Sequence, residues 1–300
     1  MPAPLLMVLA TLLFATMGVC VKLASDLYDA SEIVMYRGLV GMTMMAVLTR
    51  QQGLSLKTAV PGMHLWRSIS GVAALSLWFY AIGKLPLATA MTLNYMSSVW
   101  MALFLLGGAV LLGAQRLDWR LVAAVLLGFI GVALILRPTL DQRQLWHGLA
   151  GLISGMLSAM AYLQVTALGR AGEPELRVVF YFSMGGAVAG AAITAVSTGT
   201  LHAHTAQGAA LLLALGVLAT AAQVLMTRAY AIGRPLVNAC LQYLGIVFSF
   251  AYGMLLFKDP LTLHATVGMV LIICAGLAAT LLRSRAAPPP RDKPFNPADS

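Results

Sequence analysis

Residues 80–86 read Tyr-Ala-Ile-Gly-Lys-Leu-Pro, and residues 230–235 read Tyr-Ala-Ile-Gly-Arg-Pro. A long apolar run follows each stretch, and each half of the chain holds five apolar segments of membrane-spanning length. Because five is odd, the second copy must enter the membrane in the opposite orientation to the first. Inverted repeats of this kind occur in secondary transporters, where the binding site lies between the repeats near the bilayer midplane. The repeat therefore predicts a carrier of small molecules.

The composition supports a membrane protein. The chain is 60% hydrophobic and only 10% charged, whereas a soluble domain is roughly 25% charged. A lone segment in lipid must satisfy its own backbone hydrogen bonds, so the spans must be helices. We expect an all-α membrane protein with ten transmembrane helices as two inverted five-helix repeats, over 1–140 and 141–285, and a disordered cytoplasmic tail over 286–300. The spans expected from the apolar runs are 4–24, 32–49, 64–83, 86–112, 119–137, 146–168, 175–197, 207–230, 235–257 and 262–283.

The basic residues predict the orientation. With the N-terminus in the cytoplasm, 13 Lys and Arg fall on the cytoplasmic side and 5 on the outer side, and Arg37 within a span completes the 19. This asymmetry predicts that both termini are cytoplasmic. The net charge of +9 is thereby explained without a nucleic-acid partner. No proline falls in the middle of an expected span, so we do not expect the broken-helix ion sites found in some transporter folds.

The repeat can be traced further, through Asn94-Tyr95 and Gln242-Tyr243 in the fourth helix of each half. With the Lys/Arg-(Leu)-Pro junction between the third and fourth helices and a glycine-rich fifth helix, the chain resembles the EamA type of the drug/metabolite transporter superfamily over roughly 1–285. The resemblance implies a transporter of small metabolites, often an exporter. The Trp and Tyr content of the third and fourth helices is similar to that of the amino-acid exporters of that family, including exporters of aromatic amino acids.

Titratable groups are missing from the middle of the expected spans. All ten Asp and Glu residues and all five His residues fall in expected loops, tails or helix ends. A buried titratable group is what a proton-coupled carrier needs, so the pattern argues against proton binding by a buried side chain. It also argues against an enzyme, and no cofactor or metal motif is present.

Two amides are the foremost substrate-binding residues expected from the sequence. Asn94 and Gln242 each lie about eight residues into a helix, which is roughly 12 Å deep in a core of about 30 Å. There an amide either hydrogen-bonds a polar substrate or ties neighbouring helices together. Gln164 and Gln223 are weaker candidates of the same kind, because they lie nearer the cytoplasmic ends of their spans.

An aromatic set accompanies the amides. Trp100, Tyr95 and Tyr243 lie too deep for an interfacial belt, and their N–H and O–H groups need partners. Lining of a substrate cavity and packing between helices both remain open for these residues. The aromatic residues included in the expected site are Trp78, Tyr80, Tyr95, Trp100, Tyr162 and Tyr243. Such a wall with neutral amides suits an amphipathic ligand better than a strongly anionic one.

Arg37 is the one basic residue assigned to the interior of a span. It lies about 9 Å inside the second helix and either holds a substrate carboxylate, reaches back to the outer surface, or pairs with Asp26 or Asp29. Reaching back to the outer surface and pairing with an acidic residue are the favoured alternatives.

The sequence thus predicts a multi-pass protein of the bacterial inner membrane that exports small amphipathic metabolites, foremost amino acids, by alternating access. The expected partners are a small-molecule substrate and the lipid bilayer, and monomer or dimer stays open. A carrier of nucleobases or other metabolites, a channel-like facilitator and a non-transporting scaffold are the alternatives. The helices expected around the cavity are the first, third, fourth, sixth, eighth and ninth.

Overall fold

The protein is an all-α membrane protein in the computed structural model, which describes residues 1–97, 99–101, 103–104, 107, 119–136, 142–197, 199–232, 241–259 and 262–286. The elements are α1 (Ala3–Ala24), α2 (Ala30–Gln51), α3 (Pro61–Lys84), α4 (Leu87–Tyr95), α6 (Trp119–Leu136), α7 (Gln142–Arg170), α8 (Glu175–Ser197), α9 (Ala206–Ile232), α11 (Leu244–Tyr252), the π-helical η1 (Gly253–Phe257) and α12 (Leu263–Ala286). The expected tail lies almost wholly outside the described residues.

Six of the described helices are long and apolar enough to cross a membrane, namely α1, α2, α3, α7, α8 and α9. Their bounds agree closely with the expected spans, because the length of an apolar run is a local property of the sequence. Large apolar side chains on their outer faces, such as Val188 and Leu213, are more than half exposed. In a membrane these side chains would contact lipid, and the polar residues would gather inside the bundle.

The fourth and ninth expected spans are each interrupted by a turn among their described residues. α4 ends at Tyr95 and a turn follows at Met96, whose carbonyl accepts from the Val99 N–H at 2.9 Å. A turn at Tyr243 precedes α11, and the Tyr243 carbonyl accepts from the Ile246 N–H at 3.0 Å. Neither turn contains proline, so composition could not reveal them. Both lie beside a predicted site residue.

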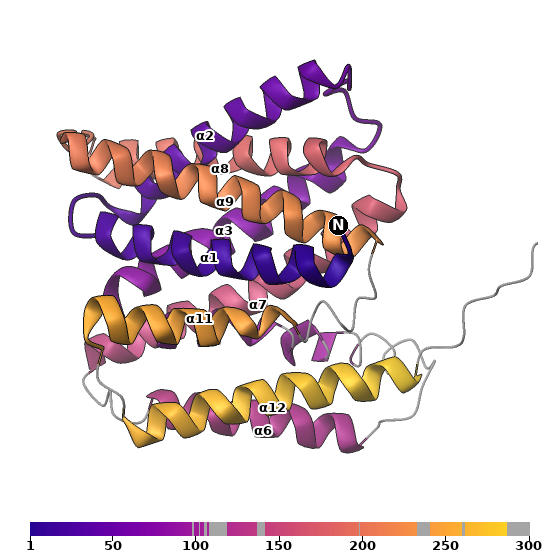
Figure 1. Ribbon diagram of the computed structural model, residues 1–300, viewed down its shortest axis with the longest axis vertical. Helices are drawn as coiled ribbons and strands as arrows, with labels where there is room; N and C mark the ends of the chain where they lie inside the picture. The colour runs from indigo at the N-terminus through magenta and orange to yellow at the C-terminus, as the bar shows by residue number, and fades with distance from the viewer. Residues whose placement is uncertain are drawn as a thin grey trace, which may run out of the picture.

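The helices pack in a reciprocal pattern between the two halves of the chain. α2 packs on α8, α4 on α11 and α6 on α12, so the second, fourth and fifth helices of each half meet their counterparts. The first and third helices exchange partners, because α1 packs on α9 and α3 on α7. Figure 1 shows α6 and α12 side by side at one edge of the bundle, away from α2 and α8. The halves are interlocked rather than separate bodies.

Glycine permits close backbone contacts between these helices. A Cβ at Gly190 of α8 would lie 2.6 Å from the Met35 backbone nitrogen and 2.7 Å from the Ser31 carbonyl of α2. A Cβ at Gly155 of α7 would lie 2.7 Å from the Leu93 carbonyl of α4. Backbone-to-backbone approach of this kind is how small residues hold membrane helices together.

Candidate functional site

A cavity of about 60 Å³ lies in the middle of the bundle. Its wall combines aromatic and apolar side chains with amides, hydroxyls and two guanidinium groups, as in pockets that hold small organic ligands. The lining residues come from α1, α2, α3, α4, α7, α8, α9 and the turn before α11, and they are Phe14, Met17, Arg37, Arg67, Gly71, Ala74, Leu75, Trp78, Asn94, Tyr95, Ser158, Ala161, Tyr162, Phe182, Gln223 and Gln242. All six spans expected around the cavity contribute: α1, α3, α4, α7 and α9 are the first, third, fourth, sixth and eighth, and Gln242 belongs to the ninth, 235–257. Residues of α2 and α8 also line the cavity.

Asn94 and Gln242 both line the cavity, and both also tie helices together. The Asn94 amide nitrogen donates to the hydroxyls of Ser154 at 3.0 Å and Ser158 at 3.2 Å, both on α7. The Gln242 carbonyl oxygen accepts from the Tyr230 hydroxyl at 3.2 Å, and its nitrogen donates to the Tyr162 hydroxyl at 3.4 Å. The two alternatives of the sequence analysis, binding and packing, are therefore combined in the same side chains.

Gln223 and Gln164 differ sharply in their surroundings. Gln223 lines the cavity and is 7% exposed, and it makes no hydrogen bond with any residue that the structure describes. The Gln164 carbonyl oxygen accepts a bond of 3.0 Å from the Ser70 hydroxyl, and Gln164 is outside the lining. Gln223 therefore presents an amide without a described partner to the cavity, whereas Gln164 joins α7 to α3.

The cavity divides the predicted aromatic set into two groups. Trp78, Tyr95 and Tyr162 line it. Trp100 instead packs against Phe104 and Phe129, with ring centroids 6.2 and 5.1 Å away.

Tyr243 is buried in the core beside the cavity, and Tyr80 is 39% exposed against His147. Trp100, Tyr243 and Tyr80 are thus not among the residues that line the cavity. The expected depth of a residue along a helix does not fix which face of the helix its side chain occupies.

Arg37 does not reach the outer surface, and it pairs with neither Asp26 nor Asp29 nor any other acidic residue that the structure describes, which corrects the favoured expectation. It is 4% exposed, lines the cavity, and lies with its guanidinium carbon 5.1 Å from the centre of the Phe182 ring. Arg67, counted among the cytoplasmic charges in the sequence analysis, is a site residue that the sequence reasoning missed. It is also 4% exposed, and its guanidinium carbon lies 4.1 Å from the same ring.

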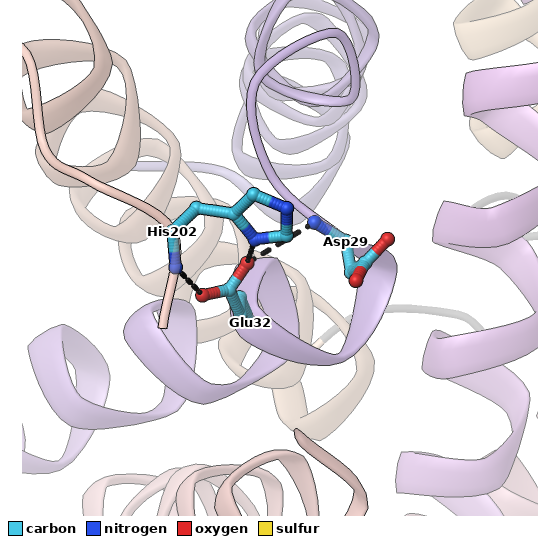
Figure 2. A group of neighbouring side chains, drawn as sticks. All are labelled: Asp29, Glu32 and His202. Atoms are coloured by element: carbon cyan, nitrogen blue, oxygen red, sulfur yellow. Dashed lines mark hydrogen bonds and ion pairs between the residues drawn. The ribbon is translucent and has the colours of Figure 1, made fainter. Parts of the chain in front are cut away.

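A buried carboxylate and a histidine meet at each end of the bundle. Before α8, Glu173 accepts from the Thr58 hydroxyl at 2.8 Å and from Arg177 at 3.0 Å, and lies 3.1 Å from His64 Nε2. At the start of α2, Glu32 accepts from the backbone N–H of His202 at 2.9 Å and contacts its Nδ1 at 2.5 Å (Figure 2). Each contact joins the start of one half's second helix to the opposite half.

Glu32, His202 and Asp29 are also the one group of potential metal ligands among the described residues, with ligand atoms within 4.8 Å of one another. The Glu32 oxygens already accept from His202 and from the Asp29 backbone N–H at 3.2 Å. The Asp29 carboxylate extends away from the imidazole (Figure 2). The cluster is therefore explained as a hydrogen-bonded start of α2, without a metal ion.

These features define the class of the protein. Apolar helices of spanning length enclose a small cavity whose lining is both polar and apolar. The molecule is a multi-pass membrane protein, and a central cavity of this kind is the architecture expected of a transporter.

Comparison with known proteins identifies the family. Residues 1–137 match the EamA-like transporter family. The pseudopaline exporter CntI of Pseudomonas aeruginosa is 32% identical over 274 residues, which cover 91% of this chain and 94% of that protein. This chain belongs to the EamA-like transporter family, and it is a secondary transporter of the drug/metabolite transporter superfamily.

More distant relatives carry different cargoes. The riboflavin transporter of Rhizobium johnstonii is 28% identical over 234 residues, covering 75% of this chain and 73% of its own. The S-adenosylmethionine uptake transporter of Rickettsia bellii is 26% identical and covers 74% of each chain. A solved crystal structure with 17% identity superimposes with a TM-score of 0.65 over 94% of this chain and 98% of its own, which shows the shared fold.

Proposed function

We propose that the protein exports a small amphipathic metabolite, an amino acid or a related compound, by alternating access through the central cavity. The observation that carries the proposal is a free amide, Gln223, in a mixed aromatic and polar cavity at the centre of the bundle. The relation to a pseudopaline exporter favours export. Carriers of nucleobases or other metabolites remain the alternative in cargo.

The inverted repeat supports alternating access. Reciprocal packing of the halves and interruptions beside both Asn94 and Gln242 are what two repeats related by an approximate twofold axis would produce. We further propose ten spans with both termini in the cytoplasm of a bacterial cell, from the distribution of basic residues. The two interrupted helices would bend at the cavity when access switches from one face to the other.

The binding residues are proposed in two roles. Gln223 and Tyr95 would contact the substrate directly, because neither side chain has a described hydrogen-bond partner. Asn94 and Gln242 would shape the cavity and hold the interrupted helices against α7 and α9. Trp78 and Tyr162 would cover the apolar part of the substrate.

Counterflow in proteoliposomes with a panel of labelled metabolites tests the function. We expect saturable counterflow, and Gln223→Ala should raise the half-saturation constant by about 2–10-fold, which corresponds to the loss of one hydrogen bond. Gln164→Ala is the matched control, because it removes the same side chain outside the cavity. It should lower thermal stability and leave the half-saturation constant unchanged.

Two results would contradict the proposal. Flux that rises linearly with concentration and shows no counterflow would indicate a channel-like facilitator. Equal kinetic effects of the two glutamine variants would place the substrate elsewhere.

A further inference from the structure

Two positive charges lie buried in the central cavity beside a single aromatic ring. Arg37 comes from α2 and Arg67 from α3, and Phe182 of α8 lies against both guanidinium groups. Among the residues that line the described cavity none is acidic, and neither arginine takes part in an ion pair with a described residue. The cavity therefore has an excess of positive charge.

The unpaired buried polar atoms of the cavity lining are all hydrogen-bond donors, which also favours an anionic ligand. The buried atoms of the cavity lining without a partner in the described part of the chain are Arg37 Nε, Arg67 Nε, Arg67 Nη1 and Trp78 Nε1. Every one of these is an N–H donor. A buried donor without an acceptor is destabilising, and an uncompensated buried charge more so.

The π face of Phe182 compensates these charges only in part, since a ring attracts a cation but neither accepts a strong hydrogen bond nor carries a charge. By contrast, Arg177 at one end of the bundle is paired with Glu173 at 3.0 Å. None of the described residues supplies the missing acceptors. A transport substrate enters this cavity in the proposed cycle and can supply them.

We infer that the substrate is a small organic dicarboxylate whose two carboxylates are held by Arg37 and Arg67. The inference rests on the proposed function and narrows its substrate class. Two negative charges balance the two guanidinium groups, and the planar guanidinium matches a carboxylate with two parallel hydrogen bonds. Amino acids with an acidic side chain, and amino-acid derivatives with a second carboxylate, belong to this class.

The rest of the lining fits the remainder of such a molecule. Leu75, Met17 and the rings of Trp78 and Phe182 provide an apolar wall for a carbon skeleton, which an inorganic anion would not need. Gln223 adds an amide that can bind an amino or hydroxyl group. The neutral amides in the sequence favoured an amphipathic ligand over a strongly anionic one. The two buried arginines make the cavity suited to a strongly anionic ligand instead.

The charge balance can be tested without knowing the substrate. Thermal unfolding of the purified, ligand-free full chain in detergent is compared for Arg37→Met, Arg67→Met and the control Arg177→Met. Removing an unbalanced buried charge should raise the midpoint by about 2 °C or more. Removing Arg177 from its pair with Glu173 should lower it.

The ligand class is tested with matched probes at equal millimolar concentration: glutamate against glutamine, aspartate against asparagine, succinate against succinamate, and inorganic sulfate. We expect a dicarboxylate to raise the wild-type midpoint by about 2–6 °C more than its monoamide, and Arg67→Met to abolish the difference. The inference is overturned if no dicarboxylate exceeds its monoamide, if sulfate does as well as the best dicarboxylate, or if Arg37→Met and Arg67→Met destabilise the ligand-free protein as Arg177→Met does.

Failure of this inference and failure of the transport function give different results. Saturable counterflow of a neutral metabolite with no preference for dicarboxylates would leave the carrier function intact and refute the dicarboxylate. Binding of a dicarboxylate without counterflow of any labelled compound would support the dicarboxylate site and refute the transport function.

Discussion

Replacement of Gly190 by alanine tests how α2 and α8 are held together. A Cβ at this position would lie 2.6 Å from the backbone nitrogen of Met35 and 2.7 Å from the carbonyl oxygen of Ser31. Both atoms belong to the backbone of α2, so no side-chain rotation can relieve the contact. The helices must separate by several tenths of an ångström along their contact to accommodate one methyl group.

Gly186, four residues before Gly190 on α8, supplies a matched control. At Gly186 the nearest atom to an added Cβ is the Val34 carbonyl oxygen, 3.8 Å away, which is an ordinary contact. Gly186→Ala therefore gains up to about 1 kcal/mol of helix propensity without a clash. Gly190→Ala gains the same propensity but suffers overpacking of typically 1–3 kcal/mol. The two variants should thus differ by about 1–3 kcal/mol.

The assay is thermal unfolding of both purified variants under identical conditions. A difference of 1–3 kcal/mol corresponds to about 3–10 °C in the midpoint, with Gly190→Ala below the wild type and Gly186→Ala at or above it. Equal midpoints would refute the close backbone contact, and with it the placement of α8 against α2.

Two further outcomes follow from contacts at other places in the bundle. Burial raises the pKa of Glu173, but hydrogen bonds from Thr58, Arg177 and His64 outweigh it and hold the pKa below its ordinary value. The carboxylate's contribution to stability is therefore complete above pH 4.5 and is lost as the pH falls through the folded-state pKa. The difference in thermal-unfolding midpoint between wild type and Glu173→Gln should become smaller as the pH is lowered. A difference that does not depend on pH would disprove this. Trp100→Ala should lower the unfolding midpoint without changing the order of preference among substrates, because Trp100 packs on Phe129 outside the cavity lining. A changed order of preference in counterflow would show that Trp100 contacts the substrate.

The spans could be read from the sequence because membrane insertion depends on local properties. The length of an apolar run fixes a helix, and the expected second span at 32–49 lies within α2 (Ala30–Gln51) for this reason. The interruption at Met96 has no such local signal. There Gly155 of α7 lies against the carbonyls of Leu93 and Asn94. A contact between helices distant in the sequence accompanies the turn, and such a contact cannot be read from a local pattern.

Three of the four amides and three of the six rings expected from the sequence line the cavity. The omission of Arg67 has a specific cause: it was counted as a topological charge although it falls within the expected span 64–83. Helical spacing carried the missing signal. Counting back from Trp78 in steps of four, three and four residues gives Ala74, Gly71 and Arg67, which share one face of α3 and all line the cavity.

The arginine pair and the glycine contact are linked through α8. Phe182, Gly186 and Gly190 recur every four residues and thus form one stripe of that helix. Gly190 lets α2 approach this stripe closely. Phe182, on the same stripe, lies against the guanidinium group of Arg37 of α2. A methyl group at Gly190 would therefore disturb more than packing. Separation of the helices would move Arg37 away from the ring and from Arg67, so a ligand that bridges both guanidinium groups would bind Gly190→Ala more weakly than Gly186→Ala.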